Sequence, residues 1–451
     1  MIDYQAMARY ADERLPRYTS YPTAPLFSSA VAAPDYRHWL AALPPATETS
    51  LYLHIPFCRS MCWYCGCHTT ITRRDEPISN YVDVLQREIE LVARHVPAPL
   101  TVRHVHFGGG TPTTIEPEAL RALVAQLRAT FHIVPGAEIA VEIDPRTLTP
   151  DMTVALGEAG FTRASLGVQS FDPRVQKEIN RIQSVDCTAA AVDGLRAAGI
   201  RGINFDLIYG LPLQTTASCV ETVEQCLALQ PDRFSVFGYA HVPKFKKHQR
   251  KINEASLPGG HARHDQATAI ADVLVAAGYV RVGLDHFARP GDTLARAQAE
   301  GRLRRNFQGY TTDACGALIG FGASAIGRLP QGYMQNEVAL GRYADCIMQG
   351  ELAAARGYRL TSDDILRADL IERLMCDLAV DVAEVCARHG ITPATLAPAL
   401  IRLRALANEG IVHIDGARIV VADHARPLVR TVASTFDAYL GDSQRLYSRA
   451  V

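Results

Sequence analysis

Short apolar strands alternate with amphipathic helices along the chain from about residue 50. In residues 78–92, apolar side chains recur at helical spacing, at Ile78, Val82, Leu85 and Ile89. Such alternation predicts parallel strands joined by right-handed crossovers. About six strand–helix units are too few for the usual closed eightfold barrel, so we predict an α/β fold with a partial, open (β/α)6-type barrel. The predicted strands are residues 51–57, 102–107, 138–144, 164–169, 202–209, 234–240 and 279–285.

Four of these strands carry polar side chains at every second position. Successive side chains point to opposite faces of a strand, so the apolar set can meet the helices while the polar set lines the barrel interior. Any one of them could be a core histidine or a solvated carboxylate, but the repetition favours a site at the strand ends. The positions are Tyr52, His54, His104, His106, Glu142, Asp144, Asn204 and Asp206.

The two ends of the chain depart from this pattern. Residues 1–45 contain four prolines between positions 16 and 34 and are predicted to be an irregular N-terminal arm. From about residue 355, Ser362 is the expected N-cap of a helix running to about 378, and a second helix covers 393–408. Asp415-Gly416 predicts the turn of a hairpin over 411–421.

We therefore divide the chain into an arm (1–45), a catalytic barrel with a substrate-site extension (46–350) and a mainly helical, winged-helix-like C-terminal domain (351–451). Because that last domain has no basic stripe, a packing or lid role is favoured over reading DNA.

The composition indicates which compartment and which classes of partner to expect. Lys+Arg 46 against Asp+Glu 47 gives a formal charge of −1, and no net basic field favours nucleic acid. The first 18 residues lack the apolar core of a signal peptide. The apolar runs are far shorter than the roughly 20 residues that span a bilayer. We expect a cytoplasmic protein without membrane or nucleic-acid partners.

Eleven cysteines in such a chain do not indicate disulfides, since cytosolic thiols stay reduced. Seven are scattered and are read as small buried hydrophobes, whereas Cys58, Cys62, Cys65 and Cys67 fall within ten residues. The spacing Cys-x3-Cys-x2-Cys after the first strand can hold three irons of a [4Fe–4S] cubane and leave the fourth free to chelate a small molecule. Zinc is the main competitor, completed by Cys67 and His68, but zinc prefers paired knuckles.

These residues resemble a known superfamily. The cysteine spacing, Tyr64 before the third cysteine, and FGGGTP (107–112) at the end of the second strand are similar to the radical S-adenosylmethionine (SAM) superfamily. Further motifs resemble the oxygen-independent coproporphyrinogen III oxidase (coproporphyrinogen III dehydrogenase) family, from about residue 15 to the C-terminus. They are RYTSYPT (17–23), LYLHIPFC (51–58), VEIDPR (141–146), NRIQ (180–183), FDLIYGLP (205–212), YAHVP (239–243), GLDHFARP (283–290) and NFQGYTT (306–312).

The arm and residues 306–312 are the specific parts of this resemblance. One departure is Ser170, which stands after Gln169 where the family pattern has Asp and where Ser is similar to the related haem-chaperone branch.

The resemblance implies that Cys58, Cys62 and Cys65 bind the cluster and that Cys67 does not. It implies SAM as cofactor, held by Glu142 and Arg181 at its ammonium and carboxylate, with a second SAM molecule nearby. The matching SAM positions are Tyr52, Tyr64, Gly109, Gly110, Thr111, Glu142, Gln169, Arg181, Asp206, Ala240 and Ile326.

The implied substrate is coproporphyrinogen III. A 5′-deoxyadenosyl radical would abstract hydrogen from a propionate β-carbon, and loss of CO₂ and one electron would leave a vinyl group, twice over, giving protoporphyrinogen IX. The implied partner is a low-potential flavodoxin- or ferredoxin-like donor, and we expect a monomer. The candidate catalytic residues, which would position the substrate, are Arg17, Tyr52, His54, Phe307 and Gln308.

Alternatives remain open at this point. Arg17 could be a solvated surface charge, and the basic residues between 244 and 251 could be an exposed face rather than a site for propionates or an electron donor. The chain could also be a non-catalytic haem carrier, a zinc-dependent DNA-binding regulator, or a sister radical enzyme acting on another tetrapyrrole.

Overall fold

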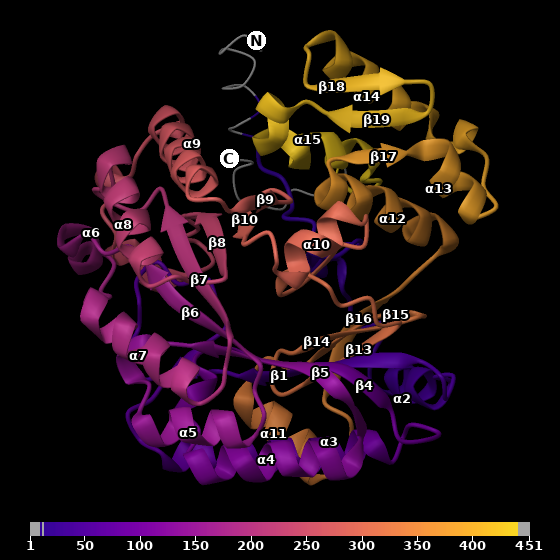
Figure 1. Ribbon diagram of the computed structural model, residues 1–451. Coiled ribbons are helices and arrows are strands. Elements are labelled where there is room, and N and C mark those ends of the chain that lie inside the picture. The colour runs from indigo at the N-terminus through magenta and orange to yellow at the C-terminus, as the bar shows by residue number, and fades with distance from the viewer. Residues whose placement is uncertain (1–9, 11–12, 441–451) are drawn as a thin grey trace.

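The computed structural model describes Tyr10 and residues 13–440. Six parallel strands form the centre of its main sheet, each joined to the next by a helical crossover (Figure 1). The strands are β1 (Glu48–Ile55), β4 (Thr101–Gly109), β5 (His132–Ile143), β6 (Arg163–Gln169), β7 (Gly202–Tyr209) and β8 (Arg233–Gly238). The crossover helices are α3 (Glu76–Ala93), α4 (Pro117–Thr130), α5 (Pro150–Glu158), α6 (Pro173–Glu178), α7 (Val185–Ala197) and α8 (Thr216–Ala228).

The sheet is open, and antiparallel strands form both of its edges. Within the described residues it has 12 strands, in the order β16-β15-β14-β13-β1-β4-β5-β6-β7-β8-β10-β9. On one side, β13 (Ala317–Phe321) lies parallel to β1 and is followed by β14 (Ile326–Leu329), β15 (Gly332–Asn336) and β16 (Ala354–Arg359). On the other side, α9 (Gly260–Ala276) leads to β9 (Val280–Val282) and β10 (His286–Ala288). The partial α/β barrel predicted from the sequence is confirmed.

The seventh predicted strand, 279–285, is the exception. Only Val280–Val282 is a strand, and it pairs antiparallel with β10 instead of adding another parallel unit. Gly283 ends it with a φ of +54°, and a Cβ there would clash with the Tyr310 ring. A positive φ breaks the extended backbone, so the chain turns back on itself.

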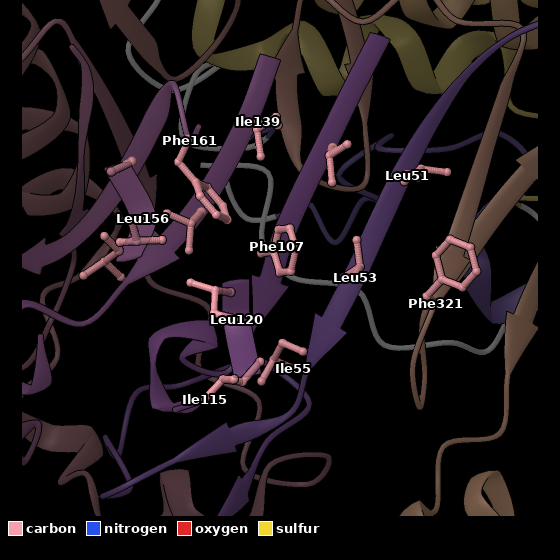
Figure 2. Close-up of a cluster of buried hydrophobic side chains, with 14 of the residues drawn as sticks. Leu51, Leu53, Ile55, Phe107, Ile115, Leu120, Ile139, Leu156, Phe161 and Phe321 are labelled. Carbon is pink, nitrogen blue, oxygen red and sulfur yellow. The ribbon is translucent and has the colours of Figure 1, made fainter. Parts of the chain in front are cut away.

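The main core lies between the strands and the crossover helices. Leu51, Leu53 and Ile55 of β1 share it with Phe107 of β4, and Phe321 of β13 lies alongside (Figure 2). The polar residues between them therefore point to the barrel interior, as the alternation predicts.

Figure 1 shows the C-terminal domain on the side of these strands opposite to α3 and α4. It contains α12 (Ser362–Asp377), α13 (Val382–Arg388), α14 (Ala397–Asn408) and α15 (Val429–Ala433). A three-stranded sheet completes it, formed by β17 (Ala379–Asp381), β18 (Val412–Asp415) and β19 (Arg418–Val421).

Two local predictions in this domain were off by one residue. The N-cap of α12 is Thr361, not Ser362, because Thr361 Oγ1 accepts the Asp364 N–H while Asp364 accepts the Thr361 N–H. The hairpin turn is Gly416-Ala417, since Asp415 still pairs with Arg418.

The N-terminal arm is less irregular than predicted. Its second half contains α2 (Ala33–Ala41), whose Trp39 and Leu40 are fully buried in the barrel core. Its first half contributes Tyr18 and Tyr21 to the core of the C-terminal domain. The arm therefore joins both cores. Residues 1–9, 11 and 12 of the expected arm, and 441–451 of the expected C-terminal domain, lie outside the described residues.

The remaining short elements are β2 (Phe57–Cys58), β3 (Thr70–Ile71), α10 (Thr293–Ala299), β11 (Arg304–Asn306), β12 (Gly309–Thr311) and α11 (Leu340–Met348). Among the described helices, none combines the length and apolarity needed to cross a bilayer.

Candidate active site

The cysteine loop begins where β1 ends, and the glycine-rich turn after β4 supports it. Gly110 N–H donates to Ile55 O and Thr111 N–H to Phe57 O, both at 2.8 Å. A Cβ on Gly110 would lie 2.6 Å from Phe57 O, and Gly109 has a φ of +115°. The glycines are thus required by the protein's own packing, in addition to any close approach of a ligand.

The three predicted cluster ligands lie on this loop, which is tied to its surroundings by its backbone. Trp63 N–H donates to Ile179 O at 2.9 Å, and the Asn180 amide donates to Met61 O at 2.7 Å. Cys58 Sγ lies 3.4 Å from Thr111 Oγ1. Burial, with a smaller contribution from the neighbouring Cys65 and Cys62, raises the pKa of Cys58 to about 11, against the lowering by the Thr111 hydroxyl. Metal binding displaces the thiol proton, so a bound metal would offset the cost of ionising this buried thiol.

The spread of the thiols argues against zinc. One tetrahedral zinc ion needs its ligand atoms roughly 4 Å apart. Among the described residues, the group of three potential metal ligands with all atoms within 4.8 Å is His104, Asp313 and Cys315, which is not part of the cysteine loop. His68, the other candidate zinc ligand, instead contacts Val338 O at 3.3 Å. A four-iron cluster spans a wider set of sulfurs than one zinc ion does.

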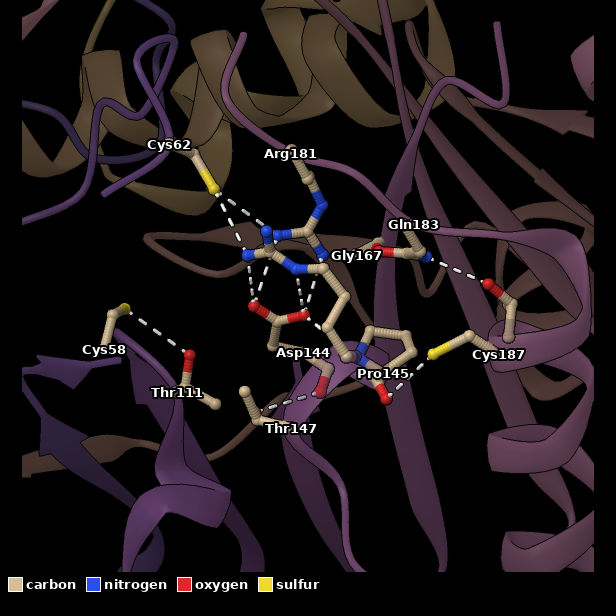
Figure 3. A network of polar contacts seen from close by, with 12 residues as sticks. Cys58, Cys62, Thr111, Asp144, Pro145, Thr147, Gly167, Arg181, Gln183 and Cys187 are labelled. Atoms are coloured by element: carbon tan, nitrogen blue, oxygen red, sulfur yellow. Dashed lines mark hydrogen bonds and ion pairs between the residues drawn. The ribbon is translucent and has the colours of Figure 1, made fainter. Parts of the chain in front are cut away.

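Two arginines converge on Cys62 (Figure 3). Arg146 and Arg181 donate to its Sγ at 3.4 and 3.6 Å, and both also bond Asp144, at 2.6 and 3.3 Å. Burial would raise the pKa of Asp144, but hydrogen bonds from Arg146 and the charge of Arg181 outweigh it and lower that pKa. Arg181 Nε is buried without a hydrogen-bond partner among the described residues. Two cations against one carboxylate leave positive charge for an anionic cluster or ligand, so these residues fit the implied cofactors.

The interior polar positions of β1, β4 and β5 form one connected chain. Tyr52 OH lies 3.0 Å from His54 Nδ1, and the Tyr52 ring stacks on His106 at 5.8 Å. His106 Nε2 lies 3.2 Å from Glu142, which also accepts the Gly109 N–H at 3.0 Å. Burial would raise the pKa of Glu142, but the bonds from His106 and Gly109 hold it below its usual value. Glu142 is therefore an anion suited to an ammonium group.

Three other predicted cofactor positions lie on further strands of the sheet, at Asp206 on β7, Gln169 on β6 and Ile326 on β14. Asp206 accepts from Ser165 at 2.8 Å and Asn204 at 2.9 Å. Burial and the charge of Glu142 raise its pKa to about 6, against the lowering by Ser165. Gln169 ends β6 with a φ of +69°. Ile326 lies against Gly320, the β13 partner of Tyr52.

A cavity of about 1220 Å³ opens beside the cysteine loop, between β8, α9 and the C-terminal domain. Four predicted residues line it: Arg17, Ala240, Phe307 and Gln308. Cys67 forms part of its wall. Tyr52 and His54 instead lie in the barrel interior beside Glu142.

Sequence reasoning missed most of the charged lining of this cavity. The arginines come from distant parts of the chain, so no local pattern marks them. Asp285 lies in the GLDHFARP motif (283–290), but the motif alone did not indicate a role for it. The missed residues are Arg14, Arg263, Arg281, Asp285, Arg305 and Arg430. A further missed residue is Gln249, fully buried, whose amide donates to Tyr64 O and Ala240 O.

Comparison with known proteins decides the family. Residues 52–226 match the Radical SAM superfamily and residues 360–428 match the HemN C-terminal domain. A Bradyrhizobium diazoefficiens protein named oxygen-independent coproporphyrinogen III oxidase is 61% identical over 98% of both chains. A protein of the same name from Paracoccus denitrificans is 43% identical over 95% of both. This chain belongs to the oxygen-independent coproporphyrinogen III oxidase family.

A solved member of the coproporphyrinogen III oxidase family agrees with the fold. The structure of coproporphyrinogen III oxidase (HemN) from Escherichia coli, a radical SAM enzyme, matches with a TM-score of 0.92 at 39% identity, over 97% of this chain and 100% of the E. coli chain. The resemblance inferred from the sequence is confirmed. Membership of the radical SAM superfamily implies a [4Fe–4S] cluster and SAM.

The departure from the family pattern at Ser170 has a local explanation. Ser170 is buried, and its Oγ accepts the Asp172 N–H at 3.2 Å where the chain turns into α6. A short acceptor is what this turn needs, so Ser preserves the turn.

Proposed function

We propose that this chain catalyses the anaerobic oxidative decarboxylation of two propionates of coproporphyrinogen III to vinyl groups, giving protoporphyrinogen IX for haem biosynthesis. The observation that carries this proposal is the 1220 Å³ cavity with arginines on several sides and the cysteine loop in its wall. A tetrapyrrole with four carboxylates needs such a volume and several cations.

Arg305 is the clearest propionate partner in this cavity. Its guanidinium lies over the Tyr310 ring at 4.4 Å, and one nitrogen donates to Arg17 O at 3.4 Å. Its Nε and Nη1 have no hydrogen-bond partner among the described residues. The Tyr310 ring and the Arg17 carbonyl hold the guanidinium in place, and its charge suits a carboxylate in the cavity that Arg305 lines. Arg17 donates to Gly238 O at 3.4 Å and lines the same wall.

The proposal assigns a role to each group of residues. When bound, the cluster and SAM supply an organic radical that removes one hydrogen atom from the substrate. Cys58, Cys62 and Cys65 would hold the cluster. Glu142 would bind the SAM ammonium and Arg181 its carboxylate. Arg17, Arg305, Phe307 and Gln308 would orient the tetrapyrrole, and the C-terminal domain would keep bulk water from the cavity.

The finer parts of the proposal are a second SAM molecule, a low-potential flavodoxin- or ferredoxin-like electron donor, and action as a monomer. The cofactor contacts proposed for Tyr52, Tyr64, Gly109, Gly110, Thr111, Gln169, Asp206, Ala240 and Ile326 rest on their positions around the Tyr52–Glu142 chain and the cysteine loop.

Anaerobic assay with coproporphyrinogen III tests the function. CO₂ and 5′-deoxyadenosine should form together with protoporphyrinogen IX, and Arg305→Gln should lower kcat/KM about ten- to a hundredfold, the effect of one charge-assisted hydrogen bond. Asp423→Asn, on the exposed part of the cavity wall, is the matched control and should be nearly neutral. Retention of haem with no CO₂ would instead indicate a carrier.

A further inference from the structure

Lysine is rare in this chain and is concentrated in one place. Of 46 basic residues only five are lysine, and four of these, Lys244, Lys246, Lys247 and Lys251, stand within eight positions together with Arg250. Elsewhere the chain uses arginine almost without exception. The concentration therefore calls for a role that lysine fills better than arginine.

This segment lies directly on the cysteine loop. Lys246 Nζ donates to Cys67 O at 2.8 Å, and His248 Nε2 lies 2.7 Å from Cys65 O. The Lys251 ammonium stands over the Trp63 ring at 5.4 Å, next to Cys62. The lysines thus cover the backbone of the loop that carries the cluster ligands.

Most of these cations are free to meet a partner. Lys244, Lys247, Arg250 and Lys251 are exposed, and Phe245 among them is 63% exposed. None of the five cations forms an ion pair within the part of the chain that the structure describes. Lys244 lines the cavity, whereas Lys247, Arg250 and Lys251 are not among its described lining residues, so their charges are available to a partner outside the cavity.

We propose that Lys247, Arg250 and Lys251 form a lysine patch that docks a small acidic electron-carrier protein of low potential. The carrier gives up one electron, and the cluster held by the loop beneath the patch takes it up. This inference rests on the proposed function because it requires that cluster.

The choice of lysine fits a transient encounter. Its ammonium is a compact, strongly hydrated charge that attracts at a distance without the bidentate grip of arginine. Electron-transfer complexes have small interfaces, and their association is steered by complementary charge. An acidic carrier placed here approaches Cys62, Trp63 and Cys65 from outside while the cavity stays open to the substrate.

The test compares two charge-matched variants of the full-length, cluster-loaded enzyme. Lys247→Gln/Lys251→Gln removes two charges from the patch. Arg342→Gln/Arg404→Gln removes two exposed charges from α11 and α14, which lie elsewhere (Figure 1). Lys247→Arg/Lys251→Arg keeps the charge. The probe is a purified bacterial flavodoxin, an acidic FMN protein, titrated in its oxidised form at several salt concentrations.

We expect the patch variant to bind flavodoxin about tenfold more weakly at low salt, with a shallower salt dependence, and to be reduced more slowly by flavodoxin hydroquinone. The α11/α14 variant should bind like the wild type. The arginine variant keeps the charge and should bind at least as tightly, but it should release flavodoxin more slowly, because guanidinium groups bind carboxylates in a bidentate way. Dithionite, which needs no docking, should support equal SAM cleavage in all of them.

Unchanged flavodoxin binding in the patch variant, or an equal loss in both double glutamine variants, would overturn the proposal. The proposal would also be overturned if the patch variant lost dithionite-driven SAM cleavage to the same extent as flavodoxin-driven reduction. The lysines would then stabilise the cysteine loop itself. Failure of the wild type to decarboxylate coproporphyrinogen III would instead count against the proposed function, since oxidised-flavodoxin binding is measured without turnover.

Discussion

Glu88 and Asp144 are both carboxylates held in polar networks within the structure, but their surroundings differ. Glu88, on α3, accepts hydrogen bonds from Gly322 N–H and the Asn336 amide at 2.6 Å and from Tyr343 OH at 2.7 Å. All three donors are neutral. Asp144 instead lies between the guanidinium groups of Arg146 and Arg181.

The first network closes on itself and the second does not. Burial raises the pKa of Glu88 to about 7, against the lowering by its three donors, and the donors tie α3 to the edge strands and α11. Around Asp144 the positive charges outnumber the negative one, and Arg181 Nε has no partner among the described residues. A network completed by the chain is structural, whereas one left with surplus charge is built for a ligand.

The largest expected loss of activity comes from the cysteine loop beside the Asp144 network. Cys58→Ser, Cys62→Ser or Cys65→Ser should abolish the visible absorption of the cluster and all activity, because each removes one of three thiolate ligands. Cys67→Ser, on the exposed next turn, is the control and should keep iron and sulfide. Iron analysis of anaerobically prepared protein measures both. Loss of iron in the Cys67 variant with retention in the Cys65 variant would reverse the ligand assignment.

For the closed network, Glu88→Ala should lower the free energy of unfolding by about 3–5 kcal/mol, because three donors lose their acceptor in a dry site. Iron content of the folded fraction should stay unchanged. Urea unfolding followed by circular dichroism measures the loss. A change below 1 kcal/mol would show that the network is not structural.

The raised pKa of Glu88 also predicts a pH dependence. The native carboxyl binds a proton up to about pH 7, while the unfolded one releases it near its ordinary value of 4.5. The native state therefore binds more protons between these values, so the free energy of unfolding falls as pH rises from 4.5 to 7. Glu88→Gln should remove about 3 kcal/mol of that fall. Parallel unfolding curves of variant and wild type across this range would contradict the argument.

The same contrast separates what the sequence predicted from what it could not. The cysteine loop, the glycine turn and the six parallel strands are local patterns, and all were predicted. The Glu88 network and the arginines of the cavity join residues hundreds of positions apart, such as Arg14 and Arg430, and have no local signature. The strand predicted at 279–285 ends at Val282, because Gly283 turns the chain despite the β-rich pattern around it.

Within the barrel interior, Glu142→Ala should weaken SAM binding about ten- to a hundredfold and leave the cluster intact. A carboxylate beside a cationic ligand contributes about 1.5–3 kcal/mol. An anaerobic SAM titration measures the change, with Glu138→Gln, four residues earlier on β5 and bonded to Arg163, as control. Equal affinities for wild type and Glu142→Ala would make Glu142 a structural partner of His106.

The smallest effect on stability should come from Arg181→Met in the cluster-free protein, at most about 1 kcal/mol. Asp144 keeps Arg146 at 2.6 Å, so no carboxylate is left unpaired. The substitution also removes repulsion between two guanidinium groups and a buried nitrogen that has no partner among the described residues. The methionine fills similar volume.

The loss of Arg181 should therefore appear in ligand binding rather than in folding, as weaker SAM affinity in the loaded enzyme. Arg233→Met is the matched control. Arg233 is also buried and bonds Asp292 at 2.7 Å, at the opposite ends of the strands, and its removal should not alter SAM binding. A destabilisation of Arg181→Met as large as that of Glu88→Ala would mean that the Asp144 network, too, is closed within the chain. Its surplus charge would then have no bearing on the cofactor.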